Sequence, residues 1–277
     1  MKKISKPDED NNLTSAKQFL KWAGGKKALL QDIEKFVPSD YNKYYEPFLG
    51  GGALFFKLEP SVSQLSDINS ELINTYQQVK NNVNDIIKQL KSMKYNKSTY
   101  YKIRSLKTTD KVVRAARFIY LNRTCWNGLY RENKKGEFNV PIGKYENPLI
   151  CDSDNLINAS RMLEKTELTK GDFKLVLKNC SKGDLIYLDP PYVTSHKDNG
   201  FIEYNSKIFS LEDQLRLRNT MIRLDKKGCK LIMSNADHKF IKKIYKNFNI
   251  NYVSRKSLIA ADTLKRKDVK ELIITNF

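Results

Sequence analysis

Apolar residues recur along this chain with two different spacings. Short apolar runs of strand length occupy 44–49, 62–65, 185–188, 230–234 and 270–275. Helical spacing, with apolar residues three and four apart, covers 26–37, 53–58, 71–90, 98–107, 111–121 and 211–226. Ser210 stands directly before the last of these, where a helix N-cap is expected. The alternation of strands and helices predicts an α/β fold built around one sheet.

The middle of the chain has a different character. Residues from about 80 to 165 are rich in Asn, Lys and Tyr, and 127–140 is punctuated by glycines. Two β-prone pieces flank 133–136, which predicts a hairpin. We therefore expect a flexible tail over 1–18, a catalytic cofactor-binding domain formed by 19–80 and 166–277, and an inserted recognition domain over 81–165.

Candidate chemistry is concentrated at 189–192, Asp-Pro-Pro-Tyr, directly after the apolar run 185–188. Ligands bind at the carboxyl ends of strands in open α/β sheets. Proline fixes its own φ angle, so the two prolines hold their carbonyls in set directions. The Asp189 carboxylate and the Pro190 carbonyl can then both accept hydrogen bonds from one exocyclic NH2 group. Tyr192 offers a ring on which a planar base can stack. The alternative is an ordinary turn that ends a strand.

A second candidate is the glycine loop at 46–52, Glu-Pro-Phe-Leu-Gly-Gly-Gly. The pattern Gly50-x-Gly52-x-x-Phe55 lacks the third glycine of the dinucleotide fingerprint, which argues against NAD and leaves other adenosine-containing cofactors. It is not a phosphate-binding P-loop either, because Leu20 stands where the Gly24-Gly25-Lys26 segment would need a glycine. Asp67, after the next strand, is placed to hold ribose hydroxyls. The alternatives are a tight turn and a helix N-cap.

Charge and cysteine content narrow the class of protein. The formal net charge is +19, and a polyanion is the simplest partner, although a generally lysine-rich composition gives the same excess. The four cysteines form no Cys-x-x-Cys pair and there are only two histidines, so we expect no metal site. The N-terminus is polar and no apolar run is long enough to span a membrane, which predicts a cytoplasmic protein with free thiols.

Several short blocks occur together in one order. They are Lys-Trp-Ala-Gly-Gly-Lys at 21–26, Glu-Pro-Phe with its glycines at 46–52, Asp-Ile-Asn at 67–69, Asn-Gly-Leu-Tyr-Arg at 127–131, Gly-Glu-Phe-Asn-Val-Pro at 136–141 and Asp-Pro-Pro-Tyr at 189–192. With these blocks, and with Ser-Asn at 234–235 and Lys-x-Val-x-Glu-Leu at 267–272, the chain resembles Dam-type DNA adenine-N6 methyltransferases of the D12 class, the group that modifies GATC. The resemblance runs from about residue 19 to the C-terminus. It departs at 260–264, which lacks the glycines or serines of many relatives.

The resemblance implies a Rossmann-like sheet that binds S-adenosylmethionine, with an inserted DNA-recognition domain and double-stranded DNA as partner. It implies catalytic roles for Asp189, Pro190 and Tyr192. Positions matching those around the cofactor are Trp22, Lys26, Glu46, Phe48, Gly50, Gly52, Asp67, Asp172 and Asp189. Positions matching the DNA interface are Lys21, Leu129, Arg131, Asn133, Pro141 and Tyr145.

Three of these residues have simpler interpretations. Trp22 can be a core-filling side chain. Arg131 suits bidentate contact with guanine, and Tyr145 suits insertion into the base stack, but a solvated hairpin Arg and a locally packed Tyr are the alternatives.

Four other functions remain open on the sequence. A cytosine-N4 methyltransferase also modifies an exocyclic amine, although Ser rather than Asp is more usual at position 189 there. An RNA adenine methyltransferase, a non-catalytic DNA-binding protein and a dinucleotide oxidoreductase are the others. A cognate restriction endonuclease acting on the same DNA site is a further expected partner.

Overall fold

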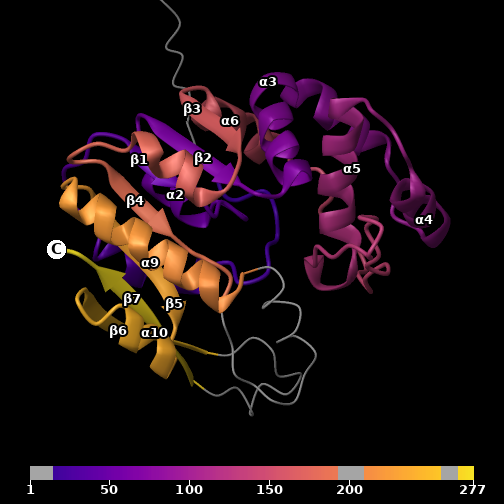
Figure 1. Cartoon of the computed structure of the whole chain (residues 1–277). Helices are drawn as coiled ribbons and strands as arrows, with labels where there is room; N and C mark the ends of the chain where they lie inside the picture. Colours follow the sequence, from indigo (N-terminus) through magenta and orange to yellow (C-terminus); the bar gives the residue numbers. More distant parts are fainter. Residues whose placement is uncertain (1–14, 193–208, 257–267) are drawn as a thin grey trace, which may run out of the picture.

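The computed structural model describes residues 15–192, 209–256 and 268–277. Within them the chain forms a seven-stranded sheet with the order β3-β2-β1-β4-β5-β7-β6 (Figure 1). The strands are β1 (Tyr44–Glu46), β2 (Ser63–Asp67), β3 (Thr166–Lys170), β4 (Leu185–Leu188), β5 (Lys230–Ala236), β6 (Asn249–Lys256) and β7 (Asp268–Thr275). The first five are parallel, and β7 runs antiparallel between β5 and β6.

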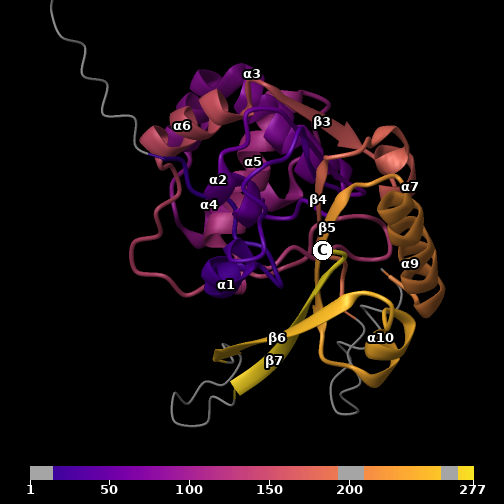
Figure 2. The ribbon, with the colours of Figure 1, turned by 90° about the vertical axis from the view of Figure 1, so that its left-hand side faces the viewer.

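Helices cover both faces of this sheet (Figure 2). One side carries α1 (Leu30–Glu34), α2 (Ala53–Leu58), α3 (Ser70–Ser92) and α6 (Ser153–Leu163). On α3 packs α5 (Lys111–Thr124), and on α5 packs α4 (Lys97–Ser105), farther from the sheet (Figure 1). The other carries α7 (Phe173–Val176), α9 (Leu211–Lys226) and α10 (Lys239–Ile244). Short 3-10 turns lie at η1 (Lys27–Leu29), η2 (Trp126–Gly128) and η3 (Leu177–Asn179).

Alternate side chains of a strand pack into two separate hydrophobic cores, one on each face of the sheet. Leu185 and Tyr187 of β4 pack into the core beneath α1 to α6, whereas Ile186 and Leu188 pack into the core beneath α7, α9 and α10. This follows from the period of two along a strand, which sends neighbouring side chains to opposite faces. A side chain at the end of a strand therefore faces whichever helical layer its position in the alternation dictates.

The strand order places a crevice at the centre of the sheet. β1 pairs with β2 on one side and with β4 on the other, so the direction of winding reverses between β1 and β4. Ligands in open α/β sheets bind outside the carboxyl ends of the strands at this switch point. Glu46 and Asp67 end β1 and β2, and Asp189 directly follows β4, so all three stand at that edge.

Most elements expected from the hydrophobic pattern are confirmed. The run 185–188 and the helix 211–226 have the bounds expected, and Ser210 caps that helix in a capping box with Asp213. The hairpin at 133–136 is present as a turn, with Glu132 bridged to Phe138. The expectation of one helix over 26–37 was wrong, because the segment begins as η1 and only Leu30–Glu34 is α-helical. The pattern missed α6, β3, α7, α10 and β6.

At two of the expected domain boundaries, the structure is continuous from one side of the boundary to the other. α3 runs through residues 80 and 81, with a non-helical residue at Asn82. Before residue 19, Ala16 is buried, and the main chain of Lys17 exchanges hydrogen bonds with the side chain of Asn155 on α6, at 2.7 and 2.9 Å. Among the described residues, no helix is both long and apolar enough to cross a membrane, and no cluster of acids, His and Cys is suited to a metal ion. The four cysteines are free.

Candidate active site

Asp189 lies at the end of β4 in a buried ion pair. Its Oδ1 is 2.8 Å from Nζ of Lys26, and the side chains are 19% and 6% exposed. The same Nζ donates a hydrogen bond to the carbonyl of Gly24, at 2.7 Å. Burial raises the pKa of Asp189, and the ammonium of Lys26 opposes that shift. The lysine, contributed by a distant glycine turn, thus fixes the direction of the carboxylate at the crevice.

Tyr192 is held from two sides. Nζ of Lys26 lies 4.5 Å from the centroid of its ring, within the range of a cation–π contact. The Tyr192 hydroxyl donates to Oε2 of Glu271 on β7, at 2.6 Å, and Glu271 is only 2% exposed. Glu271 was not singled out for any role from the sequence. The only signal was its place in the block 267–272. Pro190, between the two anchored side chains, is buried.

Glu46, at the end of β1, is a buried acid on the same side of the sheet. Its carboxylate accepts hydrogen bonds from the Tyr44 hydroxyl, at 2.8 Å, and from the main-chain N–H of Phe55 on α2. Burial, together with the nearby charge of Asp189, raises the pKa of Glu46 to about 8, against the effect of those hydrogen bonds. The free site therefore holds a carboxyl group that is mostly protonated at neutral pH. A cation bound beside it would favour its ionised form.

The glycine loop is packed against Trp22. Gly50 and Gly52 have φ angles of +48° and +63°, in the left-handed region that favours glycine. A Cβ on Gly50 would lie 2.6 Å from Cδ1 of Trp22, so the ring closes over the loop with no room for a side chain. Trp22 also stacks on Tyr130, with centroids 5.8 Å apart. Trp22 is thus partly buried against the first core, and the same ring forms a wall of the loop.

Asp67 ties the end of β2 to the glycine loop. Its Oδ2 accepts from the Gly50 N–H at 3.2 Å, and its Oδ1 accepts from the Asn69 N–H at 2.9 Å. The interpretation as a helix N-cap was wrong, because Asn69 caps α3 instead. Ile68 beside it is 71% exposed, an apolar surface at the crevice edge that sequence reasoning did not single out.

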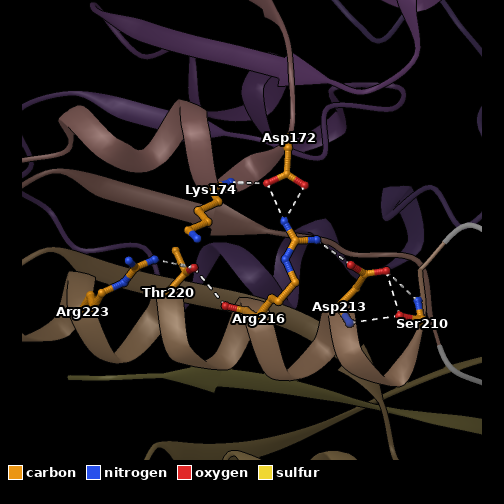
Figure 3. A network of polar contacts seen from close by, with 7 residues as sticks. All are labelled: Asp172, Lys174, Ser210, Asp213, Arg216, Thr220 and Arg223. Carbon is orange, nitrogen blue, oxygen red and sulfur yellow. Dashed lines mark hydrogen bonds and ion pairs between the residues drawn. The ribbon is translucent and has the colours of Figure 1, made fainter.

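Asp172 and Phe48 lie together on the opposite, α9-covered side of the sheet. Phe48 packs on Phe173, with centroids 5.5 Å apart, and Asp172 caps α7 by accepting from the Lys174 N–H at 2.9 Å. Arg216 of α9 reaches across to the Asp172 carboxylate (Figure 3). Glu46, Lys26 and Trp22 lie on the other side of the sheet. The candidate site residues therefore lie on both faces, along one edge of the sheet.

Two expected DNA contacts form one cluster beside Trp22. Nζ of Lys21 lies 4.7 Å from the Tyr145 ring centroid and 3.5 Å from its hydroxyl. The Tyr145 hydroxyl donates to the carbonyl of Cys125 at 3.1 Å. Burial and the charge of Arg123 lower the pKa of Lys21. In this structure Tyr145 is packed locally, as its simpler interpretation has it.

The other expected DNA contacts lie in and around the hairpin. Arg131 is exposed, and its Nε donates to Oδ1 of Asn139 at 2.8 Å, which aligns the guanidinium along the hairpin. The Asn133 side chain stabilises the turn by accepting from the N–H groups of Lys135 and Glu137. Leu129 is half-buried against the first core, and the carbonyl of Pro141 accepts from the Trp126 N–H at 2.9 Å.

A cavity of about 730 Å³ opens between α5 and the hairpin turn, lined in part by Glu71, Arg104, Arg117, Phe118 and Tyr130. Asp189 and Lys26 do not line it. The charged groups converge at the sheet edge and not at this cavity, so the candidate active site lies at the sheet edge.

The sheet order, with acids at the ends of β1 and β2 and directly after β4, is that of a Rossmann-like α/β fold. The chain belongs to the D12 class of N6 adenine-specific DNA methyltransferases, whose family profile matches residues 22–259. It is therefore a site-specific adenine DNA methyltransferase.

Characterised relatives match nearly the whole chain. The Type II methyltransferase M.MjaIII of Methanocaldococcus jannaschii is 42% identical, over 94% of this chain and 99% of its own. The Type II methyltransferase M1.LlaDCHI of Lactococcus lactis is 38% identical, over 96% and 97%. A DNA adenine methylase of Haemophilus influenzae is 35% identical, over 92% of each chain.

Proposed function

We propose that this protein transfers the methyl group of S-adenosylmethionine to N6 of adenine within GATC in double-stranded DNA. The observation that carries the proposal is the buried Asp189–Lys26 pair at the end of β4, beside Tyr192 and Glu46. Adenine-N6 methylation of DNA follows from the family, whereas the cofactor, the target sequence and the residue roles are the proposal.

The residues at the sheet edge fit this cofactor. S-adenosylmethionine is cationic at its sulfonium and ammonium groups, and the edge supplies the carboxyl groups of Glu46, Asp67 and Asp189, all with a pKa raised by burial. The glycine loop under Trp22 would hold the methionine part, with Lys26 and Glu46 beside it. Asp67 would take the ribose, and Phe48 and Asp172 the adenine. When bound, the cofactor supplies an electrophilic methyl group.

The target base must leave the duplex, because its N6 is unreachable within the stack. Asp189 and the Pro190 carbonyl would accept the two hydrogens of the amino group, and Tyr192 would stack on the ring. These contacts fix the direction of the nitrogen lone pair, and such positioning supplies much of the rate in transfers of this kind. Phe201 and Tyr204, expected as second walls for the base, lie outside the described residues.

Transfer without a covalent enzyme intermediate fits the cysteines. Burial raises the pKa of Cys125 and Cys229 to about 11, so their thiols are protonated and weakly nucleophilic at neutral pH. Asp189, held by Lys26, orients the amine and needs no metal ion to do so.

The segment 81–165 would recognise DNA. Arg131 is exposed on the hairpin, where Asn139 holds its guanidinium, and Lys21 lies over the Tyr145 ring. Relatives named Type II methyltransferases support restriction–modification and hence a cognate endonuclease.

The test is to incubate the protein with S-adenosylmethionine and plasmid DNA and to map N6-methyladenine by position. We expect methylation at GATC on both strands. Methylation at another sequence would overturn the GATC assignment and leave the chemistry, whereas N4-methylcytosine in place of N6-methyladenine would overturn the assignment of the target base.

A further inference from the structure

Arg216 links the candidate adenine end of the cofactor site to the start of α9. Its Nη2 donates to both oxygens of Asp172, at 3.1 and 3.0 Å, and its Nη1 donates to Oδ1 of Asp213, at 2.6 Å (Figure 3). Asp213 is itself fixed, because it closes the capping box with Ser210. One guanidinium thus spans two carboxylates that are 41 residues apart in sequence, since the fork of Arg can serve both at once.

The hydrogen bonds leave one acceptor position on Asp172. Each carboxylate oxygen accepts about two hydrogen bonds. Among the residues that the structure describes, Oδ1 accepts from the Lys174 N–H, at 2.9 Å, and from Arg216, whereas Oδ2 accepts from Arg216 alone. The free lone pair is on Oδ2, the atom that the guanidinium also holds in place.

Arg216 is held against the aromatic residues of the same region. Its Cζ lies 5.2 Å from the Phe173 ring centroid, and Phe173 packs on Phe48. Both charged side chains of the pair remain partly exposed, at 41% and 33%. Isolated ion pairs in such surroundings contribute little to folding stability.

We infer that Arg216 is a positioning residue that aims Oδ2 of Asp172 at the 6-amino group of the cofactor's adenine. The inference rests on the proposed use of Asp172 in cofactor binding. In the described part of the chain the Arg216 side chain contacts Asp172, Asp213 and the Phe173 ring, and it acts by fixing the rotamer of Asp172. Without it, Asp172 keeps its link to α7 but loses the group that holds Oδ2.

The experiment measures calorimetric affinity for two probes in the full-length protein. One is S-adenosylhomocysteine, and the other is its analogue in which unsubstituted purine replaces adenine, so that the 6-amino group is missing. The variants are Arg216→Ala, Arg216→Lys, Asp172→Ala and the double variant of Arg216→Ala with Asp172→Ala. Arg223→Ala is the matched control, because it removes the same charge from α9 and its guanidinium contacts Thr220 instead.

We expect Arg216→Ala to weaken binding of S-adenosylhomocysteine by about 5- to 20-fold, in the range found for coupled neighbouring residues. Binding of the purine analogue should change by less than about twofold. Arg216→Lys should be intermediate, because one ammonium cannot span both carboxylates. The double variant should be no weaker than Asp172→Ala alone, and Arg223→Ala should match the wild type.

Three results would overturn the inference: equal weakening of both probes, which indicates a general structural role; no effect of Arg216→Ala; or additive losses in the double variant. If Arg216→Ala does not fold, Arg216→Lys against Arg223→Ala gives the same comparison. A wild-type protein that binds neither probe, or an Asp172→Ala variant that binds both normally, contradicts the proposed cofactor site itself and is distinguished by being independent of Arg216.

Discussion

At the scale of single residues, burial in the folded protein makes the carboxyl groups around the crevice harder to ionise. Burial raises the pKa of Glu46 to about 8 from an ordinary value of 4.5, and it also raises the pKa of Asp67 and Asp189. An acid with a raised folded-state pKa binds its proton more tightly in the folded than in the unfolded chain. Its contribution to stability is complete below the unfolded value and is lost as pH rises through the folded value.

Glu46→Gln should therefore flatten the pH dependence of stability. The wild type should lose thermal stability between about pH 5 and 9, and the variant should lose distinctly less across that range. Melting temperatures at constant ionic strength measure this. Glu164→Gln, which changes an exposed glutamate, is the control and should follow the wild type. Parallel curves for Glu46→Gln and the wild type would show that Glu46 ionises normally.

At the scale of elements, the turn between β1 and α2 depends on glycine at one position more than at its neighbour. Gly50→Ala places a Cβ against the Trp22 ring at a positive φ angle, whereas a Cβ on Gly51 meets its nearest atom at 3.4 Å, an ordinary contact. We expect Gly50→Ala to destabilise the protein by about 1–3 kcal/mol and to weaken cofactor binding, with Gly51→Ala close to the wild type. Thermal melting and calorimetry measure both effects. Equal behaviour of the two variants would contradict the packing of Trp22 on the loop.

The helices and strands differ in how well the sequence predicts them. The strand 185–188 and the helix 211–226 were predictable, because one is a continuous apolar run and the other carries its own capping box. β6 was missed because it begins Asn-Ile-Asn-Tyr and is a sheet-edge strand stabilised by pairing with β7. α10 was missed because it is short and is capped by His238.

In the candidate site, Asp67 and Asp189 were predictable, because each follows a run expected to be a strand, whereas Glu46 was placed at the cofactor only by the family resemblance. The partners that orient these acids were not predictable. Lys26 was expected near the cofactor but not in an ion pair with Asp189. Glu271 and Arg216 meet Tyr192 and Asp172 across long sequence separations, and no local periodicity encodes such contacts.

At the scale of the whole molecule, the net charge of +19 should dominate DNA affinity. Neutralising phosphates releases counterions, so the logarithm of affinity should fall linearly with the logarithm of salt concentration, by roughly 0.9 per phosphate contacted. We expect a slope steeper than about −4 in fluorescence anisotropy titrations, which corresponds to roughly four or more contacts. Lys230→Ala should leave the slope unchanged, because Lys230 begins β5 at the opposite end of the parallel strands. A slope near zero would exclude an electrostatic DNA interface.

Specificity should reside in the hairpin. Arg131→Ala should reduce discrimination at one base pair by about 1–3 kcal/mol, measured as methylation rates over substrates that vary at each position of the site. An unchanged sequence preference would make Arg131 a structural residue of the hairpin.

The central claim is that Asp189 holds the target amine, and its removal tests that claim most directly. Asp189→Asn keeps a hydrogen-bond acceptor for the buried Lys26 but removes its countercharge, so we expect a loss of stability of up to about 3–5 kcal/mol, and thermal melting must show that the variant is folded at the assay temperature. The measurement is the single-turnover rate of N6-adenine methylation, with cofactor and DNA affinities determined in parallel. We predict a fall in rate of about 100-fold or more with both affinities within about threefold of the wild type. A rate equal to that of the wild type would contradict the account.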